Sequence, residues 1–151
     1  MPHLKTMVLL GLIPLVCFFA EPDNNVEWSG VSHVGWQDRR PLCPMNGEPF
    51  DVFFRTYRFD LTDARVHLDG GATTWIDAIF DHDDGTYAVW RASIPATALQ
   101  TIHYYIELTD GSDTDYLGPA GMSDAAPTVG WELDRATLVH APLGATPGKL
   151  A

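Results

Sequence analysis

The chain has 151 residues, enough for one domain, and its content of 46% hydrophobic and 11% aromatic residues allows a substantial core. Nine Lys and Arg against 20 Asp and Glu give a formal net charge of −11. A surface so acidic repels nucleic-acid phosphates and anionic lipid headgroups, so nucleic acid and membrane surfaces are disfavoured as partners. Neutral ligands such as sugars, and cations, remain open.

The first twenty residues predict a signal peptide. Lys5 precedes an uncharged apolar run that ends at Ala20. This run has the length of a signal-peptide core and is shorter than the roughly 20 residues that a bilayer span needs. Bulky Phe18 departs from the small-x-small rule for cleavage after Ala20, and an uncleaved anchor is the alternative. We expect residues 1–20 to be a signal peptide, the protein to be secreted or periplasmic, and no membrane contact after cleavage.

Beyond residue 20, short runs rich in β-branched and aromatic residues are separated by Asp-Gly and Gly-Gly turns. In chain order, the expected strands lie at 26–31, 51–58, 65–69, 73–80, 86–94, 101–108 and 114–117, with a proline-rich loop at 37–49. Gly70-Gly71 predicts a hairpin, because glycine adopts positive φ without steric cost. The pattern favours an all-β fold, an antiparallel immunoglobulin-like β-sandwich of about seven strands over residues 21–140. Residues 141–151 resemble a linker to an absent downstream domain.

The clearest alternation lies in the strand predicted at 101–108. Its apolar positions share one face, and these are Ile102, Tyr104, Ile106 and Leu108. His103, Tyr105 and Glu107 alternate with them. A period of two over eight residues predicts a strand with one face on the core and the other facing water.

Signatures of catalysis are missing from the sequence. It contains no nucleophile-elbow, zinc-protease, phosphate-loop or dinucleotide-binding motif, and its six histidines do not fall at metal-ligand spacing. The carboxylates cluster in turns, where Asp bonds nearby backbone amides; these are Asp81, Asp83, Asp84, Asp110, Asp113 and Asp115. We expect no catalytic residue, no metal site and no cofactor. Calcium at these acidic turns is an alternative, although Ala92 stands where an EF-hand loop needs its bidentate Glu.

Two aromatic residues are expected to face solvent on the predicted strands. Trp75 shares a face with Asp77 and Ile79, opposite Ile76, Ala78 and Phe80, and Tyr105 lies on the polar face with His103. Exposed aromatic rings stack on the C–H faces of sugars. We therefore predict Trp75, Tyr105 and His103 as carbohydrate-binding residues. The alternative is that the aromatic residues fill the core or an interface with a neighbouring domain.

Three segments carry a resemblance to a known family: VEWSGVSH at 26–33, DRRPLCP at 38–44 and IHYYIELTDGSDTDY at 102–116. They resemble the N-terminal domain that precedes the barrel in bacterial α-amylase-family glycoside hydrolases, such as neopullulanases, maltogenic amylases and branching enzymes. The resemblance covers residues 26–140. It implies an immunoglobulin-like or starch-module-like sandwich leading into a catalytic (β/α) barrel, which would be this chain's partner. The family's catalytic carboxylates lie on barrel strands, so none carries over to this chain.

The resemblance also implies a function. The chain is expected to be a non-catalytic domain of a secreted α-glucan-active enzyme, which positions the barrel, contributes to an oligomer interface or binds α-glucan by stacking. The alternatives are a stand-alone exported carbohydrate-binding module and an adhesion-type spacer.

Overall fold

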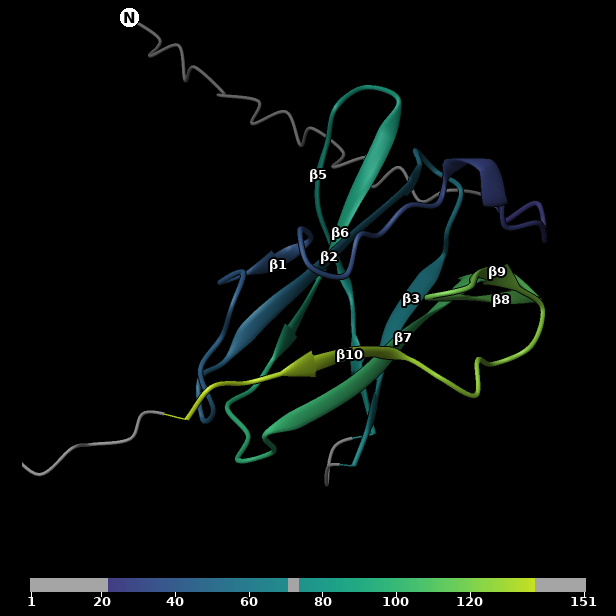
Figure 1. Cartoon of the computed structure of the whole chain (residues 1–151). Helices are drawn as coiled ribbons and strands as arrows, with labels where there is room; N and C mark the ends of the chain where they lie inside the picture. The colour runs from purple at the N-terminus through teal and green to yellow at the C-terminus, as the bar shows by residue number, and fades with distance from the viewer. Residues whose placement is uncertain (1–21, 71–73, 138–151) are drawn as a thin grey trace, which may run out of the picture.

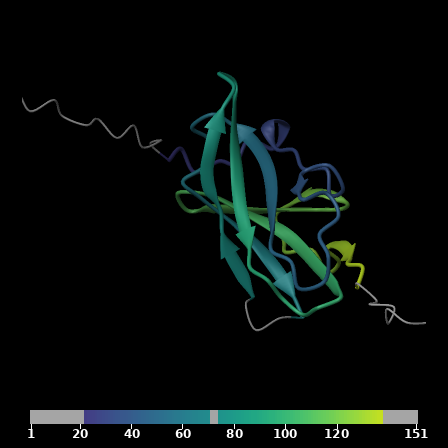
Figure 2. The same cartoon turned by 90° about the vertical axis from the view of Figure 1, so that its left-hand side faces the viewer.

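The computed structural model describes residues 22–70 and 74–137, which form two antiparallel sheets (Figure 1). The four-stranded sheet has the order β1 (Arg39–Arg40), β2 (Phe50–Tyr57), β6 (Tyr87–Ile94) and β5 (Ile79–Asp83). The six-stranded sheet has the order β4 (Trp75–Asp77), β3 (Asp63–Asp69), β7 (Thr101–Asp110), β8 (Asp113–Gly118) and β9 (Gly121–Ser123), and β10 (Trp131–Asp134) also pairs with β7. In Figure 2, which is turned by 90° about the vertical axis from Figure 1, the two sheets lie one behind the other.

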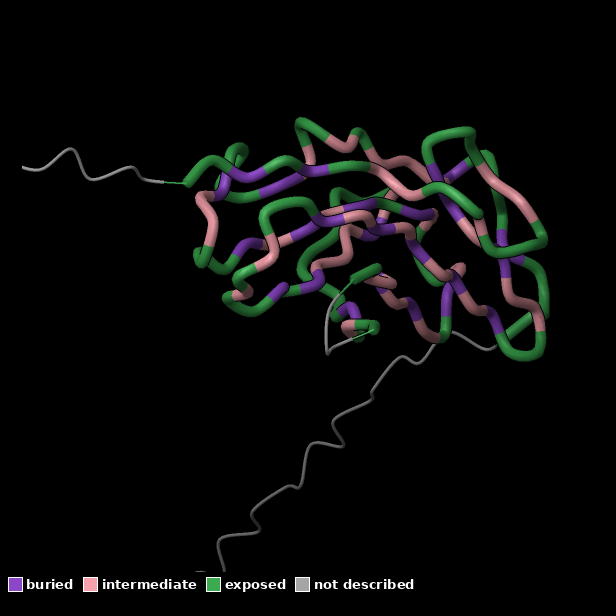
Figure 3. The backbone as a smooth tube through the Cα atoms, turned by 60° about the horizontal axis from the view of Figure 1, so that its bottom comes forward, coloured by how far each residue is buried: buried purple, intermediate pink, exposed green. Residues whose placement is uncertain are grey.

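The core lies between the two sheets. The four-stranded sheet contributes chiefly Phe50, Val52, Phe54, Ala92 and Ile94, and the six-stranded sheet contributes Ala64, Val66, Ile102, Tyr104, Ile106 and Leu108. The alternation predicted for β7 is confirmed, because its four inward residues are at most 1% exposed while their neighbours are partly exposed. Figure 3 shows this alternation of buried and more exposed residues along the strands. The predicted all-β antiparallel sandwich is therefore confirmed.

The described residues form ten strands rather than about seven. β1, β4 and β9 have two or three residues each, too few to show an alternation in sequence. β1 lies inside the segment predicted as a loop at 37–49, and β10 covers a short apolar stretch near the end of the domain.

The strand predicted at 26–31 is wrong, because this segment contains a single turn of 3-10 helix, η1 (Trp28–Gly30). The backbone N–H groups of residues 23–27 donate to the carboxylates of Asp110, Asp113 and Asp60 at 2.8–3.3 Å. Side chains distant in sequence thus take the donors that a strand would offer to a neighbouring strand.

The single strand predicted at 73–80 is also wrong, since the chain changes sheets within it. β4 ends at Asp77 in the six-stranded sheet and β5 begins at Ile79 in the other. Small, buried Ala78 lies at the crossing, where its amide donates to the carbonyl of Ala64 at 2.8 Å. Phe80, predicted to face inward, is consequently 52% exposed.

The predicted signal peptide at 1–20 and linker at 141–151 lie outside the described residues. Within the described part of the chain, no helix combines the length and apolar character needed to cross a membrane.

Candidate functional site

The outer face of the six-stranded sheet brings four ring-bearing side chains into a row across adjacent strands. Trp75 on β4 lies opposite His67 on β3, and His67 lies opposite Tyr105 on β7. Tyr116 on β8 continues the row, with its ring centroid 6.1 Å from that of Tyr105. We call these four residues the aromatic row. It arises because antiparallel register places one outward side chain of each strand beside the next.

The rings of the aromatic row differ in what they offer a ligand. His67 and Tyr105 are stacked, with centroids 4.7 Å apart and planes 3° from parallel. Tyr105 therefore has a ring neighbour on both sides, and its hydroxyl is the polar group that it can offer a ligand. Burial chiefly, then the neighbouring Tyr116 and Glu107, raise the pKa of Tyr105, so its phenol stays protonated at neutral pH. Trp75, at the end of the row, is 51% exposed and offers an indole face.

Charged side chains hold the row in place. The Oε2 of Glu107 lies 2.8 Å from Nε2 of His67, which orients the ring that stacks on Tyr105. Arg65 Nη1 lies 3.7 Å from the other oxygen of Glu107, and its Nε donates to Asp77 at 3.0 Å. Glu107 and Asp77 are thus each paired with a basic group, which is compatible with a neutral ligand on this face.

A hollow of about 340 Å³ adjoins the aromatic row. His103 and Tyr105 of β7, His67 of β3 and the segment 127–130 are among its lining residues. Gly130 allows this segment to approach β7, because a Cβ there would lie 2.5 Å from the carbonyl oxygen of Tyr104. Pockets of roughly 300–1,000 Å³ accept small ligands, so the hollow has room for a ring-sized group.

The structure brings the three predicted carbohydrate-binding residues to one face. Trp75 is exposed as expected, and Tyr105 and His103 line the hollow, where His103 Nε2 lies 3.1 Å from Glu132. Reasoning from the sequence missed His67 and Tyr116. These two residues join the row through the register between neighbouring strands, and the periodicity of a single strand does not reveal that register.

The acidic turns use their carboxylates for folding. Besides the contacts of Asp110 and Asp113 with the N-terminal segment, Asp115 accepts a hydrogen bond from the indole N–H of Trp28. Asp84 accepts from the amide of Tyr87 at 2.9 Å. Among residues 22–70 and 74–137, no group of three or more His, Cys, Asp or Glu side chains is arranged to hold a metal ion.

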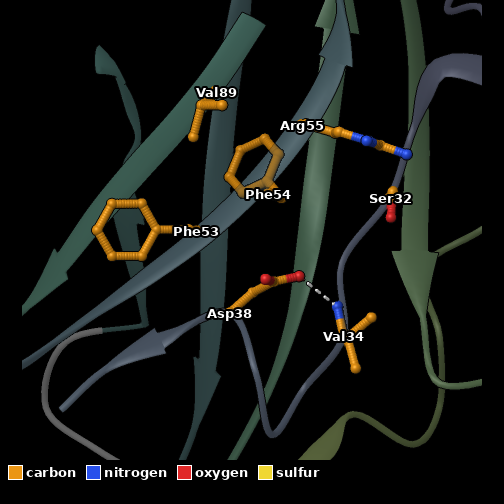
Figure 4. A pocket seen from close by; sticks show the side chains of 7 residues that line it. All are labelled: Ser32, Val34, Asp38, Phe53, Phe54, Arg55 and Val89. Carbon is orange, nitrogen blue, oxygen red and sulfur yellow. Dashed lines mark hydrogen bonds between the residues drawn. The ribbon is translucent and has the colours of Figure 1, made fainter. Parts of the chain in front are cut away.

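A smaller hollow of about 280 Å³ lies against the four-stranded sheet (Figure 4). There the carboxylate of Asp38 accepts from the amide of Val34 at 2.6 Å. The guanidinium of Arg55 lies 4.3 Å from the ring centroid of Tyr87. Its charged groups are thus engaged within the protein, and the aromatic row is the better candidate site.

Comparisons with known proteins show which solved structures have a similar fold. No protein-family model matches the chain. A cyclomaltodextrinase is similar in structure, with a TM-score of 0.59 and 14% identity, over 71% of this chain and 19% of that one. A maltogenic amylase from S. marinus is similar with a TM-score of 0.56 and 15% identity, over 79% of this chain and 16% of that one. The chain thus spans less than a fifth of the length of either, and the resemblance expected from the sequence is confirmed at the level of the fold.

Proposed function

We propose that this chain is a non-catalytic domain of a secreted α-amylase-family glycoside hydrolase, and that its aromatic row binds α-glucan. The likeness in fold to parts of a cyclomaltodextrinase and a maltogenic amylase supports the first half of the proposal. The second half is carried by one observation, a row of rings on the outer face of the six-stranded sheet with a half-exposed tryptophan at its end.

The chemistry of the face suits a neutral sugar chain. One glucose ring stacks its C–H face on the indole of Trp75. The hydroxyl of Tyr105 and Nδ1 of His103 exchange hydrogen bonds with sugar hydroxyls in the adjoining hollow. A neutral glucan also escapes repulsion by the net charge of −11.

Affinity electrophoresis of residues 21–151 in gels containing soluble starch tests glucan binding. We expect starch to retard the wild-type chain and Trp75→Ala to abolish the retardation. Tyr105→Phe keeps the ring between His67 and Tyr116 and removes only the hydroxyl, so it should reduce the retardation in part. Phe59→Ala is the control, because Phe59 is an aromatic residue that is 55% exposed and lies outside the row. Equal mobility of the wild type with and without starch would remove glucan binding from the proposal.

A separate observation favours contact with a catalytic barrel. All of β5 is exposed at the edge of its sheet, with Ile79 at 54% and Phe80 at 52%. Exposed apolar side chains on an edge strand mark an interaction surface. We expect the isolated chain to self-associate through this edge in sedimentation experiments and Phe80→Ser to suppress the association. A chain that stays monomeric at high concentration argues against the contact.

Sequencing the genomic DNA past codon 151 tests the domain assignment directly. An in-frame or frameshifted continuation that encodes a (β/α) barrel supports it. A stop codon followed by unrelated sequence supports the alternative, a stand-alone exported carbohydrate-binding module.

A further inference from the structure

A third hollow, of about 410 Å³, is lined in part by residues of β1 and β10. The positions of these two strands are labelled in Figure 1. Arg39 of β1, Trp131 of β10 and the loop 33–36, which includes Trp36, are among its lining residues. None of these residues belongs to the aromatic row. An inference about this hollow is therefore independent of the proposed function.

Arg39 is the unusual residue of this hollow. It is only 7% exposed, and its Nε and Nη1 atoms are buried without a hydrogen-bond partner among the described residues. No ion pair in that part of the chain includes it. A buried guanidinium without a counter-charge is costly, so an anionic group that pairs with it would be stabilised.

The two nearby carboxylates, Asp38 and Glu132, have other hydrogen-bond contacts. The carboxylate of Asp38 accepts from the backbone amide of Val34. Glu132, which lines the hollow, lies 3.1 Å from His103 on the outer face of the sheet. Neither carboxylate forms an ion pair with Arg39 among the described residues.

The indole of Trp131 forms a fixed wall. It packs edge-on against His33, with ring centroids 4.6 Å apart, and His33 in turn lies 2.6 Å from the carbonyl oxygen of Phe53. Burial lowers the pKa of His33, so the ring is neutral at neutral pH and Arg39 carries the positive charge beside it. Gly35 packs close to the same indole, since a Cβ there would lie 2.7 Å from Cδ1 of Trp131. Trp36, 66% exposed, offers a second and open indole.

We propose that this hollow binds a carboxylate ligand with a ring-sized body. The carboxylate pairs with the guanidinium of Arg39, and the body lies against the indoles of Trp36 and Trp131. A uronic acid combines the two features, because it carries a carboxylate on a sugar ring. A free organic acid supplies the same carboxylate.

Titrations of residues 21–151 with sodium glucuronate, glucose and sodium acetate at constant ionic strength test the site. Binding is followed by tryptophan fluorescence and by the indole N–H signals in 1H–15N spectra. We expect glucuronate to give saturable shifts of the Trp36 and Trp131 signals and glucose at the same concentrations to give none. Arg39→Gln should weaken binding at least tenfold, and Arg40→Gln, at the adjacent exposed arginine, should leave it unchanged.

Trp36→Ala provides a second variant in case Arg39→Gln does not fold, and it should weaken glucuronate binding several-fold. Acetate binding as tightly as glucuronate, lost in Arg39→Gln, would support the carboxylate site and identify a free acid as its source. Equal binding of glucose and glucuronate would overturn the proposal. Wild-type affinity for glucuronate in both folded variants, Arg39→Gln and Trp36→Ala, would also overturn the proposal.

Discussion

Arg135, the residue after β10, is the side chain whose replacement should cost the most stability. It is 1% exposed, and its guanidinium makes five hydrogen bonds. The four acceptors are the backbone carbonyls of Met45, Glu48, Thr97 and Leu99, at 2.6–3.3 Å. These carbonyls belong to two loops, one before β2 and one before β7, so a single side chain ties both loops to the end of the domain.

The expected cost follows from these contacts. Arg135→Met keeps most of the apolar volume and leaves the carbonyls of both loops without their donor. Losing several hydrogen bonds to a charged group, and leaving buried carbonyls without a donor, costs about 3–5 kcal/mol in all, a large part of the 5–15 kcal/mol that is typical of a domain. With a urea m-value of about 2 kcal/mol/M, the unfolding midpoint should fall by about 2 M. Arg135→Lys should lose about 2 kcal/mol, because an ammonium group cannot span four carbonyls as a planar guanidinium does.

Urea unfolding followed by tryptophan fluorescence measures these differences. Arg40→Met is the matched control, since Arg40 is exposed and, among the described residues, donates only to the nearby carbonyls of Gln37 and Arg39. We expect a change below about 0.5 kcal/mol. A midpoint for Arg135→Met within about 0.5 M of wild type would refute the assigned role, because the carbonyls would then be satisfied without the guanidinium.

Three further predictions concern stability. Burial lowers the pKa of His33 in the folded chain, so below about pH 6.5 the unfolded chain binds the proton more readily and stability should fall. His33→Gln should remove much of this pH dependence in urea melts measured at several pH values. Burial raises the pKa of Asp60 to about 6, so the folded chain holds this proton more tightly than the unfolded chain does. The stability that this protonation contributes is lost as pH rises from about 4 through 6. Asp60→Asn should therefore be more stable than wild type at pH 8 but not at pH 3. Gly130→Ala should cost about 1–3 kcal/mol in thermal melts, because the added Cβ meets the backbone of Tyr104. In Gly47→Ala no atom lies within 4 Å of the added Cβ, so this control measures only the cost of a positive φ in a residue with a side chain.

Long strands could be predicted from the sequence because their periodicity extends over enough residues. β7 has ten residues, and the apolar and polar positions of 101–108 alternate without a break. β2 and β6, with eight residues each, lie within one residue of their predicted ranges. Short strands were missed for the same reason, since two or three residues of β1 or β9 carry no period.

Two errors had a different cause, because they depended on contacts between distant residues. The N-terminal segment has strand-like composition, yet carboxylates more than thirty residues away bind its amides. The break at Ala78 depends on a hydrogen bond to Ala64 in another strand. Local propensity contains neither contact, and tertiary contacts routinely override it.

The candidate site was predictable residue by residue but not as a unit. Exposure of Trp75 and the outward position of Tyr105 follow from alternation within each strand. The stacking of His67 on Tyr105 follows from the register between β3 and β7, which no single strand determines. The sequence therefore pointed to a face, and the structure adds the row that organises it.

The position of the aromatic row on β7 separates binding from folding. β7 pairs with three strands, β3, β8 and β10, and its inward residues are all buried in the core. Its outward residues His103 and Tyr105 touch none of that core, because successive side chains of a strand point to opposite faces. Replacing Tyr105 by Phe therefore changes the polar group offered to a ligand while the inner face stays packed. A loss of glucan retardation in that variant with an unchanged urea midpoint would identify a binding contact, whereas a parallel loss of both would mean that Tyr105 acts through the structure of the sheet.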